Sequence, residues 1–337
     1  MTLTSDPARV LAPPVEPDSV LREVTVGAAR MEAEGVLSLE LKDPFGRELP
    51  SWTPGAHIDV VLPSGAVRQY SLCSDPSDLT AYRIAVLRES DGRGGSAEIH
   101  DSALVGRALR IRGPRNHFVL EDAASYLLVA GGIGITPILA MARSLSQAGK
   151  RFRVLYGGRK RSSMAFVQEL RELVGDALHL VPEDEKGMID LATALASCES
   201  GTDVYCCGPE ALLQAVDAAC GEASTVADLH VERFSAAPES PAPEPGQGAT
   251  GFEVELRRSA AFFTVGPEDS LIDMVRQHCP EVMSSCEEGF CGTCETRVLE
   301  GEPEHHDTIL TEKERASNKT MMICVGRCTS ERLVLDL

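Results

Sequence analysis

A proline-rich segment near the end of the chain most limits the ways in which it can fold. Residues 236–251 read AAPESPAPEPGQGATG, and proline, glycine, alanine and glutamate dominate them. No apolar period runs through the segment, so it cannot bury enough surface to order itself and should act as an extended linker. The chain of 337 residues therefore divides into separate folding units, and residues 252–337 form one of them.

The region before the linker changes character near Glu121. Residues 19–120 hold short apolar runs separated by proline and glycine, a pattern typical of an antiparallel β-barrel. Residues 121–235 instead alternate strand-like and helical runs, which predicts an open, mostly parallel α/β sheet. The expected barrel strands are Val20–Val26, Val36–Leu41, His57–Leu62, Arg83–Leu87 and Ala108–Arg112, and the expected α/β strands are Tyr126–Ala130, Phe152–Tyr156, Ala177–Val181 and Asp203–Cys207.

Four cysteines in the last unit have the spacing of metal ligands. Cys286, Cys291 and Cys294 are separated by four and then two residues, and Cys324 follows at a distance. This spacing matches the plant-type ferredoxin arrangement for a two-iron, two-sulfur cluster, in which each iron takes two protein thiolates. Six of the 11 cysteines lie between positions 279 and 328, and such clustering favours metal chemistry over disulfides.

Two other interpretations of these cysteines compete with the cluster. A structural zinc site more often shows a pair of C-x-x-C elements, and this block holds one. Unligated core cysteines would not gather at ligand spacing, although Cys279 and Cys328 fall outside the spacing and are expected to be ordinary buried residues. The block resembles a β-grasp ferredoxin domain, with expected strands at Phe252–Arg257 and Ala261–Val265 and an expected helix from Ser270 to His278.

A glycine-rich turn follows the first strand of the α/β unit. Gly131, Gly132 and Gly134 precede Thr136 and Pro137, and the helix that starts there offers backbone donors and a positive dipole end to a pyrophosphate. We expect Thr136 to cap this helix. The run is not a full dinucleotide fingerprint, because Pro137 takes the place of the third glycine, and a tight connection without a ligand is the plain alternative.

The turn GGIGITP and the later run Tyr205-Cys-Cys-Gly-Pro209 together resemble the nicotinamide domain of the ferredoxin-reductase superfamily. By that resemblance Cys207 lies beside the nicotinamide, next to Gly208 and Pro209. Basic residues, among them Arg159 and Arg161, follow the second strand, where they can meet the 2′-phosphate of NADPH. A solvated charge run is the alternative, so both NADH and NADPH stay open as substrates.

A flavin is expected between these two sites. A reduced nicotinamide gives up two electrons as hydride, a two-iron cluster accepts one electron, and a flavin can do both. The run R-x-Y-S at Arg68, Tyr70 and Ser71 resembles the flavin motif of the same superfamily, with the arginine favouring reduced flavin, the tyrosine packing on the ring and the serine donating to it. A backbone nest with a hydroxyl for the flavin phosphate is expected at Gly94, Gly95 and Ser96, or else a loose hairpin loop.

The order barrel, nicotinamide domain and C-terminal ferredoxin resembles the phthalate dioxygenase reductase family, including vanillate demethylase reductases, over nearly the whole chain. The reductase portion of self-sufficient haem-thiolate monooxygenases is an equal match. The resemblance implies FMN as the flavin, and it places the ring of Phe234, in an E-x-F run with Glu232, near that flavin. The middle residue of that run, Arg233, is a bulky charge, and the resemblance does not tell us its consequence.

The expected function is electron transfer from NAD(P)H through FMN and the cluster to a separate oxygenase, of the Rieske or demethylase type. A haem-thiolate monooxygenase as acceptor and an iron–sulfur redox sensor are the alternatives. The net charge of -19 argues against nucleic-acid binding. Neither a signal peptide nor a membrane span is found, so we expect a cytoplasmic protein. We also expect the protein to be monomeric.

Overall fold

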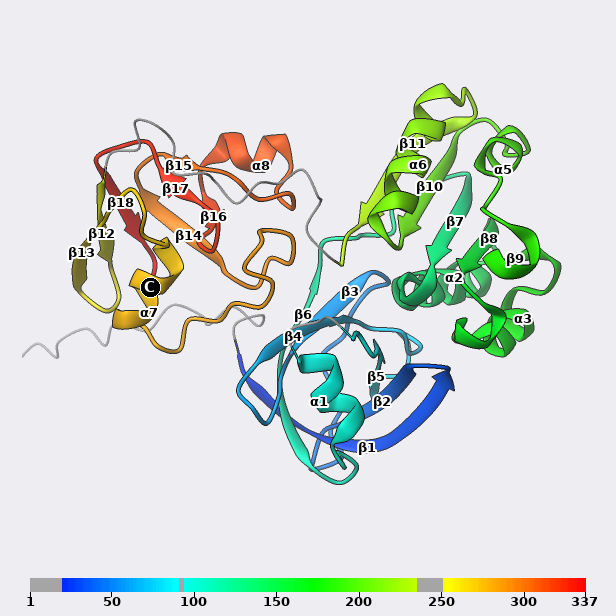
Figure 1. Ribbon diagram of the computed structural model, residues 1–337, viewed down its shortest axis with the longest axis horizontal. Coiled ribbons are helices and arrows are strands. Elements are labelled where there is room, and N and C mark those ends of the chain that lie inside the picture. The colour runs from blue at the N-terminus through cyan, green and yellow to red at the C-terminus, as the bar shows by residue number, and fades with distance from the viewer. Residues whose placement is uncertain (1–19, 91–93, 235–250) are drawn as a thin grey trace, which may run out of the picture.

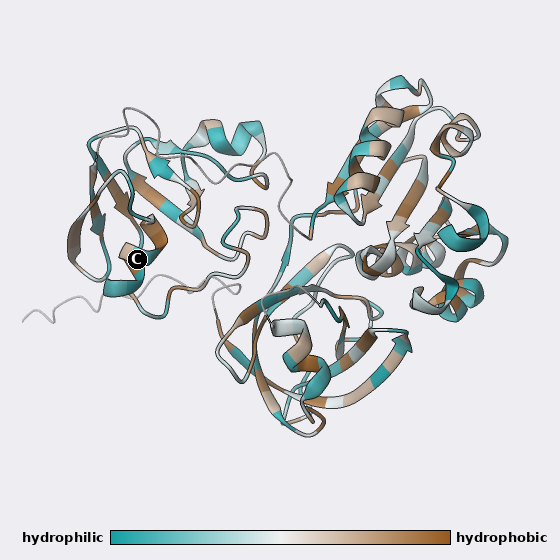
Figure 2. Cartoon of the chain, in the orientation of Figure 1, coloured by the Kyte–Doolittle hydropathy of each residue, from teal (hydrophilic) through white to brown (hydrophobic). Residues whose placement is uncertain are grey.

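The computed structural model describes residues 20–90, 94–234 and 251–337. These residues form three lobes, each built on its own β-sheet (Figure 1). Apolar residues concentrate on the strands and on the helix faces turned toward them, as the hydropathy colouring shows (Figure 2). The expected linker, residues 236–251, lies outside the described residues except for Gly251.

The barrel lobe is a six-stranded antiparallel sheet in the order β4-β3-β6-β1-β2-β5. The edge strands β4 and β5 approach each other and curl the sheet into an open barrel around a core that includes Leu39, Ile58 and Ile111. A short helix that the sequence analysis did not predict follows β5. The elements are β1 (Arg22–Ala33), β2 (Val36–Lys42), β3 (Ala56–Val61), β4 (Val67–Ser71), β5 (Tyr82–Leu87), α1 (Gly95–Asp101) and β6 (Ala108–Asn116).

The α/β lobe is a five-stranded parallel sheet in the order β11-β10-β7-β8-β9. Apolar side chains cover both faces, because α2 and α3 pack on one side and α5 and α6 on the other. The strand order reverses between β7 and β10, and ligands of such sheets bind beyond the carboxyl ends of the strands at that point. The elements are β7 (Ser125–Gly131), α2 (Ile135–Gln147), β8 (Arg151–Gly158), α3 (Val167–Val174), β9 (Leu178–Pro182), α4 (Glu183–Lys186), α5 (Leu191–Ala196), β10 (Thr202–Cys207), α6 (Glu210–Glu222) and β11 (Val226–Glu232).

The C-terminal lobe is a mixed sheet in the order β13-β12-β18-β14-β16, on which α7 buries Leu271, Ile272 and Val275. Residues 285–294, here termed the cysteine loop, run between α7 and β14 and face the barrel lobe. The elements are β12 (Phe252–Leu256), β13 (Ala261–Val265), α7 (Leu271–His278), β14 (Glu295–Glu300), β15 (Pro303–Glu304), α8 (Glu312–Ser317), β16 (Thr320–Met322), β17 (Arg327–Cys328) and β18 (Arg332–Leu335).

The expected fold class is confirmed: an antiparallel barrel sheet, a parallel α/β sheet and a ferredoxin-type sheet follow one another along the chain. The expectation that Thr136 caps its helix is wrong. The turn tightens into a 3-10 helix at Gly132–Gly134, so Gly134 takes the cap position and the Thr136 hydroxyl donates to the Ile133 carbonyl inside the first turn. Within the described residues no helix is both long and apolar enough to span a membrane.

Candidate flavin, nicotinamide and iron–sulfur site

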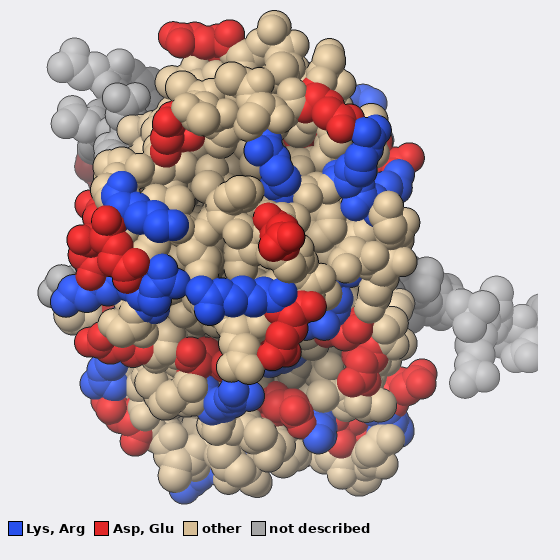
Figure 3. Space-filling model, turned by 90° about the vertical axis from the view of Figure 1, so that its right-hand side faces the viewer, with Lys and Arg blue, Asp and Glu red and all other residues tan. Residues whose placement is uncertain are grey.

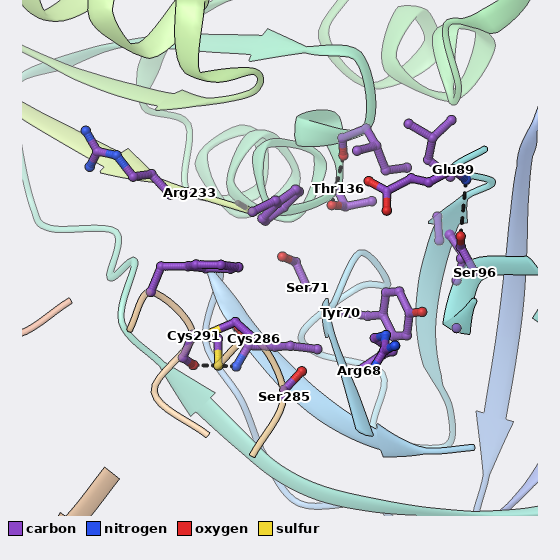
Figure 4. Close-up of a pocket in the computed structure, with 18 residues that line it drawn as sticks. Arg68, Tyr70, Ser71, Glu89, Ser96, Thr136, Arg233, Ser285, Cys286 and Cys291 are labelled. Carbon is purple, nitrogen blue, oxygen red and sulfur yellow. Dashed lines mark hydrogen bonds between the residues drawn. The ribbon is translucent and has the colours of Figure 1, made fainter. Parts of the chain in front are cut away.

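One pocket lies where the three lobes meet (Figure 4). It is partly open to solvent. Residues of all three lobes line it, and they include Arg68, Tyr70, Ser71, Gly95, Ser96, Thr136, Phe234, Cys286 and Cys291. Sequence positions more than 200 residues apart therefore share one cavity.

Residues of strand β4 line the barrel side of this pocket. Arg68 donates from Nη1 to the carbonyl of Val67 at 2.8 Å, which holds the guanidinium at the strand. Burial raises the pKa of the Tyr70 hydroxyl above its usual value, so this side chain stays a neutral aromatic surface. Ser71 is buried at the end of the strand, with its hydroxyl directed toward the α/β lobe.

The expected phosphate loop continues directly into α1. Gly94 has a φ of 81°, a left-handed conformation that glycine adopts without strain, and it precedes the first helical residue, Gly95. A Cβ at Gly95 would lie 2.6 Å from Nε of Arg68, so glycine lets the helix start against that side chain. The Ser96 hydroxyl accepts from the backbone N–H of Glu89 at 3.1 Å. The earlier residues of this run, Gly92 and Arg93, lie outside the described residues.

The two glycine motifs of the α/β lobe pack backbone against backbone at the carboxyl ends of β7 and β10. A Cβ at Gly131 would lie 2.8 Å from Cδ of Pro209, and one at Gly134 would lie 2.7 Å from the backbone N of Gly208. Only glycine permits this approach. Gly132 has open space where a Cβ would lie and a φ of 55°, and its carbonyl accepts from the Tyr156 hydroxyl at 3.1 Å.

A short chain of side chains links the barrel to the end of β10. The Ser71 hydroxyl lies 3.4 Å from Oε2 of Glu232, and Cys207 Sγ lies 3.9 Å from the same oxygen. Burial raises the pKa of Glu232 to about 8, because few polar groups compensate its charge. Burial also raises the pKa of Cys207, and the nearby Glu232 carboxylate adds to this effect, so the thiol stays neutral. No nucleophile is generated here.

Phe234 and the basic residues after β8 are more exposed than the glycine motifs and Cys207. Phe234 is 39% exposed and lines the pocket, while Arg233 pairs with Glu210 at 3.3 Å. Arg159 and Arg161 follow β8 as expected, but Arg161 forms a two-pronged ion pair with Glu185 at 3.2 and 3.1 Å. Basic and acidic side chains are interspersed over this side of the molecule (Figure 3).

The four cysteines at ligand spacing come together in the structure. Cys286 interacts with both Cys291 and Cys324, and Cys324 interacts with Cys294, so the four sulfurs form one continuous group. Backbone N–H groups point at these sulfurs, from Glu288 to Cys286 at 3.4 Å and from Thr293 to Cys291 at 3.5 Å. Four thiols with backbone donors suit a binuclear cluster, which needs stabilised thiolates.

Among the residues that the structure describes, no three His, Cys, Asp or Glu side chains converge on one point at metal-ligand distance. Cys279 and Cys328 are buried and bond to Ser259 and Ser330 instead, outside the group of four sulfurs.

Two family models match the chain. Residues 109–228 match the N-terminal domain of dimethylamine monooxygenase subunit DmmA-like proteins. Residues 254–329 match the 2Fe-2S iron-sulfur cluster binding domain, and this range contains all four cysteines.

Whole-chain relatives extend the match. The phthalate dioxygenase reductase of Burkholderia cepacia is 38% identical over 95% of this chain and 98% of its own length. The chain belongs to the phthalate dioxygenase reductase family. A toluene-4-sulfonate monooxygenase system reductase subunit of Comamonas testosteroni is 41% identical over 93% of this chain and 98% of its own length.

Solved structures agree with this family. The structure of phthalate dioxygenase reductase, described as modular for electron transfer from pyridine nucleotides to [2Fe-2S], aligns with a TM-score of 0.66 and 37% identity over 94% of this chain and 98% of that chain. An intact type IV self-sufficient cytochrome P450 monooxygenase aligns with a TM-score of 0.83 and 42% identity over 97% of this chain. This chain spans only 43% of that longer protein.

Several residues that line the pocket are not among those that the sequence motifs single out. Gln69, Ile133, Ser285 and Phe290 reach it because each neighbours a motif residue along the chain. Gln69 lies between Arg68 and Tyr70 on β4, and its Nε2 donates to the Cys291 carbonyl of the cysteine loop.

Proposed function

We propose that this reductase takes hydride from NAD(P)H and delivers single electrons, through FMN and a two-iron cluster, to a separate oxygenase. The observation that carries the proposal is the shared pocket. Flavin-motif residues of β4, the first turn of α2 and the ligand candidates Cys286 and Cys291 all line it. A flavin bound there would contact the nicotinamide side and the cluster side at once.

FMN would supply the conversion of a two-electron donor into a one-electron donor. Around it, Arg68 places a positive charge that favours the reduced flavin, Tyr70 offers a neutral ring surface and Ser71 offers a hydroxyl. The phosphate would take the backbone donors that begin α1, together with a hydroxyl. The proposed flavin residues are Arg68, Tyr70, Ser71, Gly94, Gly95 and Ser96.

The dinucleotide would lie at the switch point of the parallel sheet. The backbone of the β7–α2 turn faces this point, and the helix dipole of α2 adds partial positive charge for a pyrophosphate. Cys207 is a buried neutral thiol that would give the nicotinamide a water-free surface, and the ring of Phe234 would cover the flavin. The proposed residues are Gly131, Gly132, Gly134, Thr136, Cys207, Gly208, Pro209 and Phe234, with Arg159 and Arg161 at the adenosine ribose.

We assign residues 19–120 to the FMN barrel, 121–235 to the nicotinamide domain and 252–337 to the ferredoxin domain, joined by the linker. The cluster ligands would be Cys286, Cys291, Cys294 and Cys324. We further propose a monomeric protein that works in the cytoplasm.

The acceptor is proposed to be a Rieske-type oxygenase or a demethylase. Its support is the likeness to reductase subunits that serve separate oxygenase components. A haem-thiolate monooxygenase is the second candidate, supported by the 42% identity to a self-sufficient cytochrome P450.

Cofactor analysis and two artificial acceptors test this proposal. Acid-released flavin should be FMN in a one-to-one ratio with the chain, and iron and sulfide should each reach two per chain. NAD(P)H should drive reduction of ferricyanide and of cytochrome c. Stoichiometric FAD, or a colourless protein with bound zinc, would contradict the assignment.

The acceptor class is tested by turnover with purified oxygenases. A Rieske oxygenase reduced by this chain at the rate of its native reductase supports the first candidate. Efficient reduction of a haem-thiolate monooxygenase alone would instead support the second.

A further inference from the structure

The cysteine loop is held to the barrel lobe by a set of directed hydrogen bonds. Gln69 donates from Nε2 to the Cys291 carbonyl at 2.6 Å, and Ser285 donates from Oγ to the Val67 carbonyl at 3.1 Å. Arg112 donates from Nη2 to the Thr293 carbonyl at 2.6 Å. These contacts come from β4 and β6, which flank β3 in the barrel sheet.

Asp59, on β3 between those two strands, completes the set. Its side chain is fully buried, and its two oxygens have different partners. Oδ2 accepts from Arg112 Nε at 3.0 Å and from Arg115 Nη2 at 2.8 Å, both within the barrel lobe. Oδ1 accepts from the Thr293 hydroxyl of the cysteine loop at 3.0 Å. One carboxylate therefore ties the barrel to the loop.

The apolar core of the C-terminal lobe does not extend into this junction. In the described part of the chain, its buried apolar cluster contains only residues numbered 252 and above. The polar contacts at the cysteine loop must therefore set the orientation of the lobe, because an apolar interface would tolerate sliding and these directed bonds do not.

We propose that Asp59, together with Arg112, is a docking latch for the ferredoxin domain. It is a positioning residue: it fixes the cysteine loop, and with it Cys291, against the flavin-motif strand. The latch deepens the proposed function, because it sets the distance that electrons must cross between the flavin pocket and the cluster. Opening the latch would release the cysteine loop from the barrel lobe, so that the cluster can face an external acceptor.

Two variants test the latch in the holoenzyme. Asp59→Asn removes the charge that pairs with both arginines, and Thr293→Val removes the hydroxyl, with its contacts to Asp59 and to Cys291 Sγ, while keeping the shape of the side chain and the internal Asp59–arginine contacts. Hydrogen exchange of the cysteine loop should become about tenfold faster in Asp59→Asn and about threefold faster in Thr293→Val, because the first variant removes the carboxylate charge and the second removes one hydroxyl donor to it. Small-angle scattering should show a larger radius of gyration for Asp59→Asn.

Asp43→Asn serves as the matched control. Asp43 is a buried carboxylate of the same lobe that pairs with Arg47 at 2.8 Å, and its hydrogen-bond partners among the described residues, Phe45 and Arg47, both lie in its own turn. Its variant should therefore leave loop exchange and scattering unchanged. With NADH, flavin bleaching should keep its rate in all three variants. The cluster signal in rapid-freeze electron paramagnetic resonance should appear about tenfold more slowly in Asp59→Asn, about threefold more slowly in Thr293→Val and at the wild-type rate in Asp43→Asn.

The latch proposal would be overturned if the folded variants Asp59→Asn and Thr293→Val showed the same hydrogen-exchange rates and the same scattering as the wild-type protein. If Asp59→Asn fails to fold, Thr293→Val decides alone, and unchanged exchange in it overturns the proposal. Exchange and scattering do not depend on the flavin type or on the acceptor. A wrong cofactor or acceptor assignment would therefore leave these readouts intact, and the two failures are distinguishable.

Discussion

The barrel lobe contacts its two neighbours in opposite ways. Toward the α/β lobe it shares one continuous apolar core, in which Phe118 and Ala85 of the barrel side pack with Leu128, Ile138 and Tyr205. Arg83 reinforces this junction through Glu169 on α3, at 2.6 and 3.0 Å. Toward the C-terminal lobe it offers directed hydrogen bonds and no shared core among the described residues.

This difference matches the two transfers that a reductase of this family performs. Hydride transfer needs two rings held in contact, because small displacements are costly, and a shared apolar core gives that rigidity. An electron can cross a gap between sites, so the second junction can be polar and reversible. Polar interfaces between domains are typical of partners that separate and rejoin.

The largest expected effect comes from removing the cluster. Cys291→Ala deletes one of the four proposed ligands but keeps the backbone carbonyl that accepts from Gln69. Reduction of cytochrome c should fall to background, because the cluster no longer forms, while ferricyanide reduction by NAD(P)H should persist. Steady-state assays with both acceptors measure this. Loss of ferricyanide activity in a folded variant would mean that the two junctions are not independent.

The next largest effect concerns the apolar junction. Phe118 is buried and its ring centroid lies 5.6 Å from that of Tyr205 across the two lobes. Phe118→Ala should cost about 3–5 kcal/mol of unfolding free energy, because it opens a cavity in the shared core. Chemical denaturation followed by flavin fluorescence and by circular dichroism should show both lobes unfolding together. Separate transitions would show that the core does not couple them.

A smaller effect is expected at Arg159 and Arg161, the residues proposed to bind at the adenosine ribose. Replacing Arg159 and Arg161 with glutamine should weaken NADPH about tenfold and leave NADH nearly unchanged, because only the former carries a 2′-phosphate. Glu185 competes for Arg161, so Glu185→Gln should improve NADPH use. Kinetics with both cofactors at low and high salt measure this. Equal losses for the two cofactors would identify the run as a solvated surface.

The smallest effect is a pH dependence of the reduction rate that comes from Glu232, which contacts both Ser71 and Cys207. Burial raises the pKa of Glu232 to about 8, so the group is neutral at pH 7 and becomes a carboxylate as the pH rises through that value. The new negative charge would oppose the charge that hydride brings to the flavin. Ferricyanide reduction should therefore fall several-fold above pH 8, and Glu232→Gln should abolish that fall. A pH profile that is the same in both proteins would contradict this role.

Local patterns in the sequence were sufficient to predict the fold class and most motifs. Strand alternation, glycine turns and the cysteine spacing are short-range signals, and the parallel and antiparallel sheets follow from them. The helix α1 escaped prediction because its seven residues carry too little periodicity. Thr136 was misplaced because the 3-10 turn before α2 shifts the cap to Gly134.

Contacts between distant residues were decided only by the tertiary structure. Glu232 meets Ser71 across 161 positions, and Asp59 meets Thr293 across 234 positions. Asp59 belongs to no sequence motif and occupies an ordinary position on a strand, so its burial beside two arginines cannot be inferred from the residues next to it in the sequence. Sequence by itself determined which residues are candidates to hold cofactors, because that chemistry depends on residue type and local spacing. The relative placement of the lobes depends on long-range packing, and it alone determines the junctions that the electrons cross.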